Sequence, residues 1–244
     1  RGVYDLETLS RRLNLGRLHP FEMNHVYDSM ESVKELMLYV KKHKIQKTPF
    51  HESEVDEFLR DINKSIDLDI SRRFTNTTMD ENFLMAGVDE TIDTLVKENS
   101  VMLVAFEDII KKIELLLKEE NAGSSNRLVT LGLLEKEGYY ISLSKNRFSL
   151  IESKFKKDEE FSKFSVKKLT NSVKITSSFT DTLSDKIMKN RRKIVVLVKD
   201  RYIQLQALYQ RRYALLFDRV IAYVSDLDVG VSSSKIAQMY KHSR

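Results

Sequence analysis

A long apolar stripe without a helix breaker constrains this chain more than any other feature. From about Thr180 to Ser225 neither Gly nor Pro occurs, and apolar residues recur at helical spacing. The stripe comprises Leu183, Ile187, Ile194, Leu197, Val198, Leu205, Leu208, Leu215, Leu216, Val220 and Tyr223. About 45 helical residues, at about 1.5 Å each, would extend roughly 70 Å. That length exceeds a small domain and predicts a rod-like or coiled-coil-like arm.

A second apolar stripe at helical spacing precedes the first. It runs from about Val88 to Leu117 and indicates a helix of about 30 residues. The segment Asn121–Asn126 is expected to end this helix, and Asp226–Gly230 is expected to end the later one. Net charge is −7 over residues 1–126 and +12 over residues 127–244. Pairing of the two long helices would therefore bring acidic and basic segments together.

The residues before Val88 predict a bundle of shorter helices. Asp5 is a suitable N-cap for a first short helix, and Gly16 follows its end. Pro20 fits the first turn of a longer helix, and Thr48-Pro49 separates that helix from another over residues 52–66. Residues 67–84 show no clear period and are expected to be irregular.

Between the two long helices the apolar period changes to that of strands. Residues 127–133 and 139–143 are β-prone, and the intervening turn Leu134–Gly138 predicts a hairpin. Ser172–Thr176 alternates and is expected to form a third strand, whereas residues 144–165 are polar and rich in lysine. We therefore expect a mostly α fold: a helical core bundle, two long antiparallel helices and a small antiparallel β module at their tip.

No catalytic or metal motif stands out. The chain has no Cys, which excludes disulfides and thiolate metal sites, and it has no Gly-x-x-x-x-Gly-Lys-Ser/Thr loop for a nucleotide. Candidate metal ligands gather at His43, His51, Glu52 and Glu54, where a solvated loop is the favoured interpretation. Asp67 and Asp69 are expected to be loop residues rather than a catalytic pair. No segment reaches the roughly 18 apolar residues of a membrane span. We expect no enzyme activity from this chain.

The strongest functional candidate is the basic segment that includes the third predicted strand. Lysine and arginine neutralise phosphates, and hydroxyl and amide groups bond to phosphate oxygens. The candidate phosphate contacts are Lys145, Arg147, Lys154, Lys156, Lys157, Lys163, Lys167, Lys168, Thr170, Asn171, Ser172 and Lys174. Phe148, Phe155, Phe161 and Phe164 are expected to form the small core of the module, which favours backbone contact over base stacking. The residues alone leave open a merely solvated lysine-rich loop.

Several short segments also follow one another in a definite order. They are Asp5-Leu-Glu-x-Leu-x-x-Arg-Leu-x-x-Gly-x-x-x-Pro20, the residues from Phe83 to Leu95, Gly138-Tyr-Tyr-Ile-Ser-Leu-Ser-Lys145, Leu169-Thr-Asn-Ser-Val-Lys-Ile-Thr176 and Asp226-Leu-Asp-Val229. In residues, order and spacing they resemble the core, lever and clamp domains of the MutS family of DNA mismatch-repair proteins.

The resemblance implies a division into five parts. These are a partial core helical domain at 1–86, an outgoing lever helix at 87–126, a clamp at 127–178, a returning lever helix at 179–228 and a return to the core at 229–244. In the family the clamp grips the DNA backbone without reading sequence. Asn171 and Lys174 take the positions of the family's Asn and Arg, and Thr170 stands where Lys is common. Lys167 and Lys168 are expected to supply the charge that Thr170 lacks.

The resemblance also implies partners beyond these residues. The chain begins without Met and lacks the family's mismatch reader and ATPase, so we expect it to be part of a longer protein. That protein is expected to bind ATP and Mg²⁺, to pair with a second MutS-type subunit and to act on duplex DNA inside the cell. No cofactor is expected in this segment, and no membrane partner.

A second class of function stays open. Non-repair members of the family keep the same arms, so the chain is alternatively a structural, coiled-coil-like arm that binds a protein partner or structured nucleic acid. A DNA-binding tip should expose lysines, whereas a partner-binding tip should expose apolar surface.

Overall fold

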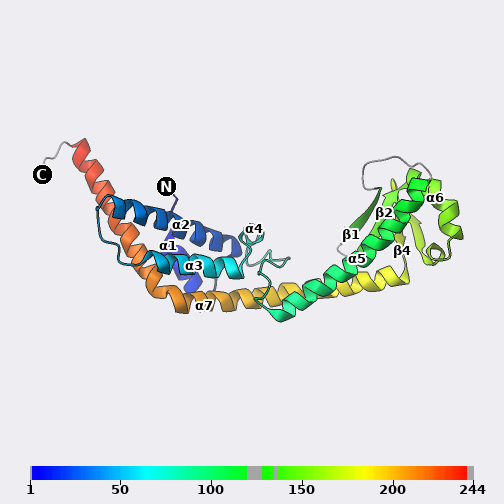
Figure 1. Cartoon of the computed structure of the whole chain (residues 1–244), viewed down its shortest axis with the longest axis horizontal. Coiled ribbons are helices and arrows are strands. Elements are labelled where there is room, and N and C mark those ends of the chain that lie inside the picture. The colour runs from blue at the N-terminus through cyan, green and yellow to red at the C-terminus, as the bar shows by residue number, and fades with distance from the viewer. Residues whose placement is uncertain (1, 120–127, 135–136, 241–244) are drawn as a thin grey trace. The chain divides into compact units, whose positions relative to one another are not determined.

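The computed structural model describes residues 2–119, 128–134 and 137–240, which form two compact units. The first unit comprises the residues up to Glu90 and those from Val195 onward, and the second comprises Thr91–Ile194. The chain is mostly helical, and the second unit also holds a four-stranded antiparallel sheet (Figure 1). The prediction of a mostly α fold with a small antiparallel β module is therefore confirmed. Among these residues, no helix combines the length and the apolar character needed to cross a membrane.

The first unit contains four helices that precede the long apolar stripes. They are α1 (Leu6–Asn14), α2 (Pro20–Lys42), α3 (Glu52–Ser65) and the single turn α4 (Leu68–Ser71). The Asp5 carboxylate caps α1 by accepting a bond from the Thr8 amide at 3.0 Å, as expected. Pro20 occupies the first turn of α2. The expected breaks near Gly16 and at Thr48-Pro49 are confirmed, because helices end before and begin after them.

The last helix, α7 (Ser178–Met239), supplies the aromatic centre of the first unit. Phe58 of α3 is fully buried, and its ring lies 5.1 Å from that of Tyr213 and 5.3 Å from that of Phe217. Gln206, also fully buried, accepts a bond from the Leu18 amide at 3.0 Å and donates one to the Leu18 carbonyl at 3.2 Å. These two hydrogen bonds satisfy both the amide and the carbonyl of Leu18, a buried residue between α1 and α2.

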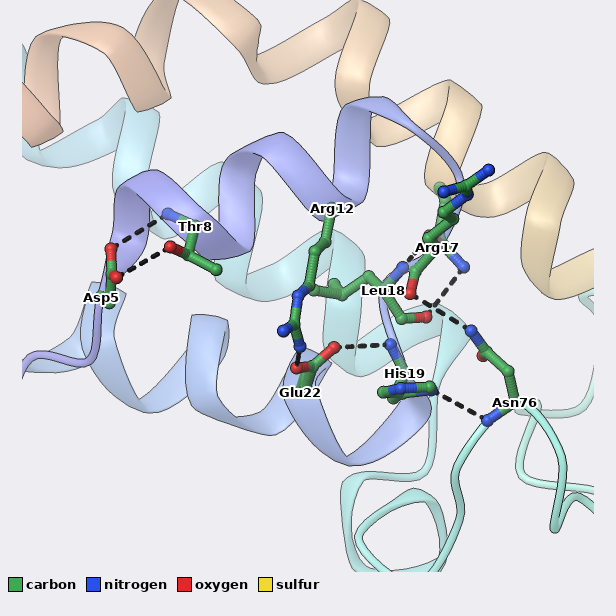
Figure 2. A network of polar contacts seen from close by, with 9 residues as sticks. Asp5, Thr8, Arg12, Arg17, Leu18, His19, Glu22 and Asn76 are labelled. Carbon is green, nitrogen blue, oxygen red and sulfur yellow. Dashed lines mark hydrogen bonds and ion pairs between the residues drawn. The ribbon is translucent and has the colours of Figure 1, made fainter.

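A polar network extends from Leu18 along the start of α2 (Figure 2). Glu22, only 4% exposed, pairs with Arg12 and accepts a bond from the His19 amide at 2.9 Å. His19 Nδ1 in turn accepts a bond from the Asn76 amide at 3.1 Å. The network therefore fixes the entry to α2 against both α1 and the irregular segment around Asn76.

The second unit is built on α5, the sheet and the first turns of α7. Its elements are α5 (Glu90–Glu119), β1 (Val129–Leu134), β2 (Gly138–Ser144), α6 (Lys145–Lys157), the 3₁₀ turn η1 (Phe161–Lys163), β3 (Ser165–Lys168) and β4 (Ser172–Thr176). The strands are all antiparallel, in the order β1-β2-β4-β3. One apolar core joins α5, the sheet, α6 and Ile187 of α7. Asn190 of α7, almost fully buried, donates bonds to Glu98 and Asn99 of α5.

The structure contains two features that the sequence did not predict, and one expectation was wrong. Residues 144–165 contain α6 and η1, because Phe148, Ile151 and Phe155 form an apolar face that is buried in the core. The sheet has a fourth strand, β3, beside the predicted Ser172–Thr176 strand. Asp226–Gly230 does not end the last helix, which continues to Met239 past the predicted boundary at 228/229. The predicted break at Asn121–Asn126 lies outside the described residues, as does the middle of the Leu134–Gly138 turn.

Candidate nucleic-acid interface

The sheet turns one face to the apolar core and presents the other as a polar surface. Ile141 and Leu143 of β2 and Val173 and Ile175 of β4 are buried in the core. Because side chains alternate along a strand, the residues between them lie on the opposite, outer face. The outer face carries Thr130, Tyr140, Ser142, Ser165, Lys167, Ser172, Lys174 and Thr176. It therefore combines hydroxyl groups with two lysines.

The Gly-Tyr-Tyr run at the start of β2 serves the fold of the second unit. Gly138 has φ +77°, and a Cβ atom there would collide with the Ser184 hydroxyl of α7. The same hydroxyl accepts a bond from the Tyr139 amide at 2.7 Å, and the Tyr139 hydroxyl accepts one from Arg191 at 3.2 Å. These contacts hold β2 against the first turns of α7.

Tyr140 lies on the outer face and links three strands. Its ring covers Gly132 on β1, where an added Cβ would come within 2.5 Å of the ring. The Lys174 ammonium on β4 lies 4.7 Å from the ring centroid, within range of a cation–π contact. Lys174 also pairs with Glu137 at 2.5 Å, and this hydrogen bond lowers the pKa of the Glu137 carboxyl. Lys174 is thus held in place, with 13% of its side chain exposed.

A polar cluster forms where α6 begins. The Lys145 amide donates to the Asn171 carbonyl at 3.4 Å, which joins the first turn of α6 to the turn between β3 and β4. Within that turn the Leu169 amide donates to the Ser172 carbonyl at 2.8 Å. Lys145, Thr170 and Asn171 are exposed, and the first turn of α6 contains no acidic residue. We call Lys145, Thr170, Asn171 and Ser172 the turn cluster.

Several of the predicted phosphate contacts are engaged with groups of the module itself. Lys154 pairs with Glu119 at 3.1 Å, while Lys156 and Lys168 share Glu152 at 2.9 and 3.4 Å. Hydrogen bonds from these two lysines lower the pKa of Glu152. Arg147 donates to the Leu128 carbonyl at 3.4 Å, at the start of β1. These four cations are therefore less available to a ligand than their number in the sequence suggests.

Three other lysines of the predicted set are exposed. Lys157 ends α6, Lys163 lies in η1 and Lys167 lies on β3. Neither Lys157 nor Lys163 forms an ion pair within the described part of the chain. Lys167 interacts electrostatically with Glu137 on the outer face. With Lys145, these lysines are the cations best placed to meet an external anion.

The phenylalanines of this segment pack as expected from the sequence. Phe148, Phe155 and Phe161 are buried, and the Phe155 and Phe161 rings stack with their centroids 4.8 Å apart. Phe164 packs partly buried against the same core. Phe148, Phe155 and Phe161 are therefore unavailable for stacking on bases.

The other candidate residues have structural roles. The Glu54 carboxylate accepts a bond from the His51 amide at 2.8 Å and pairs with Arg219 at 2.5 Å. Asp67 caps α4 by accepting a bond from the Ile70 amide at 3.0 Å. In the described ranges, no group of three or more His, Cys, Asp or Glu side chains could hold a metal ion.

Sequence reasoning missed Glu137, which pairs with Lys174 on the outer face. Its position in a predicted turn carried no signal, since the pairing depends on which strand lies beside β2. The α6 helix left a detectable signal, because Phe148, Ile151 and Phe155 are spaced for one helical face.

Comparison with known proteins agrees with the resemblance in the sequence. No family model matches the chain. A mutS homolog of Acanthamoeba polyphaga mimivirus, named for DNA mismatch repair, is 18% identical across 100% of this chain and 24% of its own length. The DNA mismatch repair protein MutS of Clostridioides difficile is 23% identical across 98% of this chain and 24% of its own length. The chain thus spans about a quarter of these relatives. Both matches cover essentially the whole chain, which is accordingly similar to a segment of MutS-type DNA mismatch-repair proteins.

Proposed function

We propose that the second unit binds the backbone of duplex DNA without reading its sequence, as the clamp of a mismatch-repair protein does. In this proposal, α5 and α7 are the levers that link the clamp to the ATPase of a longer protein. The names of both relatives refer to DNA mismatch repair. The basic charge of residues 127–244 favours a polyanion, and the aromatic side chains near the lysines are buried. The function would be exercised inside the cell, where the DNA is.

The turn cluster is the observation that carries this proposal. Lys145 is 26 positions from Asn171 in the sequence, yet their backbones are hydrogen bonded. The cluster combines a lysine, two hydroxyls, an amide and the N-terminus of a helix whose first turn has no acidic residue. Helix N-termini favour anions, and such side chains are typical phosphate ligands. The geometry suits a backbone phosphate better than a base edge.

Two matched double variants test the proposal by duplex-DNA binding across a salt series. Lys145→Gln with Lys163→Gln removes two exposed lysines, whereas Lys154→Gln with Lys156→Gln removes two that are paired with carboxylates. Both pairs change the net charge equally. We expect the first to reduce the slope of log K against log salt by about 0.9 for each phosphate that is no longer neutralised, and the second to change it little.

Two results would count against DNA binding at this site. Equal losses in both double variants would mean that binding reflects net charge alone. No binding by the wild-type chain at low salt would reject the proposal for the 244-residue chain.

A protein partner is the second candidate function. The last turns of α7 expose Val229, Val231, Ile236 and Met239, which is unusual for a helix that contacts only solvent. The sheet and α6 also expose some apolar side chains, namely Leu133, Leu134, Leu150 and Leu169. Exposed lysines outnumber these around α6 and β3, which favours DNA for the second unit.

The ATP and Mg²⁺ implied for a longer protein do not fit the residues of this chain. There is no nucleotide-binding glycine loop in the sequence and no cluster of metal ligands within the part that the structure describes. We therefore assign nucleotide hydrolysis, mismatch recognition and pairing with a second MutS-type subunit to the longer protein, as part of the same proposal.

A further inference from the structure

Two lysines lie directly opposite one another on the outer face of the sheet. Lys167 of β3 and Lys174 of β4 are cross-strand partners, and like charges in that arrangement repel. The Glu137 carboxylate bonds to Lys174 at 2.5 Å and attracts Lys167. Two lysines with one oxyanion beside them already have the composition of an anion-binding site.

Lys174 is held in place in this arrangement, whereas the Glu137 carboxylate is accessible to solvent. The Lys174 side chain is 13% exposed and extends over the Tyr140 ring, which itself covers Gly132. The Glu137 side chain is 56% exposed and lies in the turn before β2. Because the Glu137 carboxylate is open to water, its ion pair is partly screened, and another oxyanion can replace the carboxylate while the lysine stays in place.

We propose that Glu137 occupies a phosphate site formed by Lys174 and Lys167, and that a backbone phosphate of the bound nucleic acid displaces it. The inference rests on the proposed DNA-binding function and assigns a regulating residue to it. Ser142 lies opposite Lys174 on β2 and adds a hydroxyl to the same face. Glu137 thereby restrains binding until a polyanion competes for the lysines.

Inorganic phosphate tests the site without DNA. Amide chemical shifts of Lys167 and Lys174 are followed by NMR during phosphate titration of the wild-type chain, Glu137→Gln and Glu159→Gln. Glu159 is an exposed acid of the same unit, so its variant matches the change in net charge. We expect Glu137→Gln to bind phosphate about fivefold more tightly, the effect of a unit charge some 4 Å away in water. Identical midpoints in all three proteins, or shifts confined to other residues, would overturn the site.

Duplex-DNA binding then tests the displacement. We expect Glu137→Gln to tighten binding relative to Glu159→Gln, and Lys167→Gln in the Glu137→Gln background to remove the gain. If wild type binds DNA and the two Glu variants bind equally, the inference about Glu137 is wrong and the proposed function stands. If none of the proteins binds DNA although Glu137→Gln binds phosphate more tightly, the proposed function is wrong and the anion site stands without a nucleic-acid ligand. Thermal melting of each variant excludes loss of folding as the cause.

Discussion

At the scale of single residues, Gly138 shows why a residue in a family-like motif need not touch a ligand. Its backbone has φ +77°, a conformation that side chains disfavour. The space where its Cβ would lie is filled by the Ser184 hydroxyl, which is 2% exposed and bonded to the Tyr139 amide. The glycine is therefore required by the packing of β2 on α7.

Replacing Gly138 with alanine should destabilise the second unit by about 3 kcal/mol, since backbone strain adds to a steric collision. Gly87→Ala is the matched control, because Gly87 has φ +89° but nothing lies within 4 Å of its Cβ position. The control should lose only about 1 kcal/mol. Denaturant unfolding of both variants measures the difference, and equal losses would show that Ser184 adjusts without cost.

Tyr209 makes stability depend on alkaline pH. Burial raises the pKa of its hydroxyl from 10.0 to about 12. The folded state thus holds this proton more tightly than the unfolded state does. The contribution of Tyr209 to the free energy of unfolding is therefore fully present below pH 10 and falls as pH rises toward 12. The loss attributable to this side chain approaches about 3 kcal/mol.

Chemical denaturation at a series of alkaline pH values tests this, with Tyr209→Phe as comparison. The Tyr209 hydroxyl donates to the Asp61 carbonyl at 3.3 Å and also interacts with the Ser65 side chain, so phenylalanine would lose these polar contacts but keep the ring packing. The variant should lose less stability between pH 10 and 12 than the wild-type chain does. Parallel curves would mean that Tyr209 does not titrate with unfolding.

The residue scale also shows the limit of reading a binding site from sequence. Composition predicted a basic binding segment, but it could not distinguish its exposed lysines from those that are paired with carboxylates. Lys145 is exposed at a helix N-terminus, whereas Lys174 is packed on Tyr140 and bonded to Glu137. The difference arises from strand pairing and from acids on other elements, such as Glu119 on α5, which no local pattern specifies.

At the scale of elements, long periodic segments were predictable and short ones were not. The stripes from Val88 and Thr180 became α5 and α7, because one apolar face over many turns determines a helix. β3 has only four residues, two of them lysines, and it forms at the sheet edge where β4 offers its free backbone groups. Lysines are common on edge strands because they discourage further pairing. Its position beside β4 is a tertiary property that four residues cannot encode.

The end of α7 was mispredicted because Gly230 was read as a terminator. It lies inside the helix, has no positive φ, and nothing lies within 4 Å of its Cβ position. Gly230→Ala should therefore favour the helix by about 0.5–1 kcal/mol. Amide hydrogen exchange over residues 226–239 should slow in this variant and quicken in Gly230→Pro. Faster exchange in Gly230→Ala would indicate that the helix ends near Gly230, as the sequence suggested.

At the scale of the whole molecule, the chain divides into two units that each have an apolar core. One core joins α5, the sheet and α6, while the other gathers Phe58, Tyr209 and Phe217 with the short helices. α7 contributes residues to both cores, because its apolar face continues from Ile187 to Tyr223. Packed cores of this kind commonly open as separate cooperative units.

Separate opening predicts that damage to one core leaves the other protected. Gln206→Ala removes both partners of the buried Leu18 backbone and should cost the first unit roughly 2 to 4 kcal/mol. Native-state hydrogen exchange should then quicken in α2 and α3 but not in β2 and β4, and Gly138→Ala should give the reverse pattern. Because a second unit that opens alone could release a ligand while the rest of the chain stays folded, this result bears on the proposed function. Equal loss of protection in both units, from either variant, would show instead that α7 couples them into one cooperative whole.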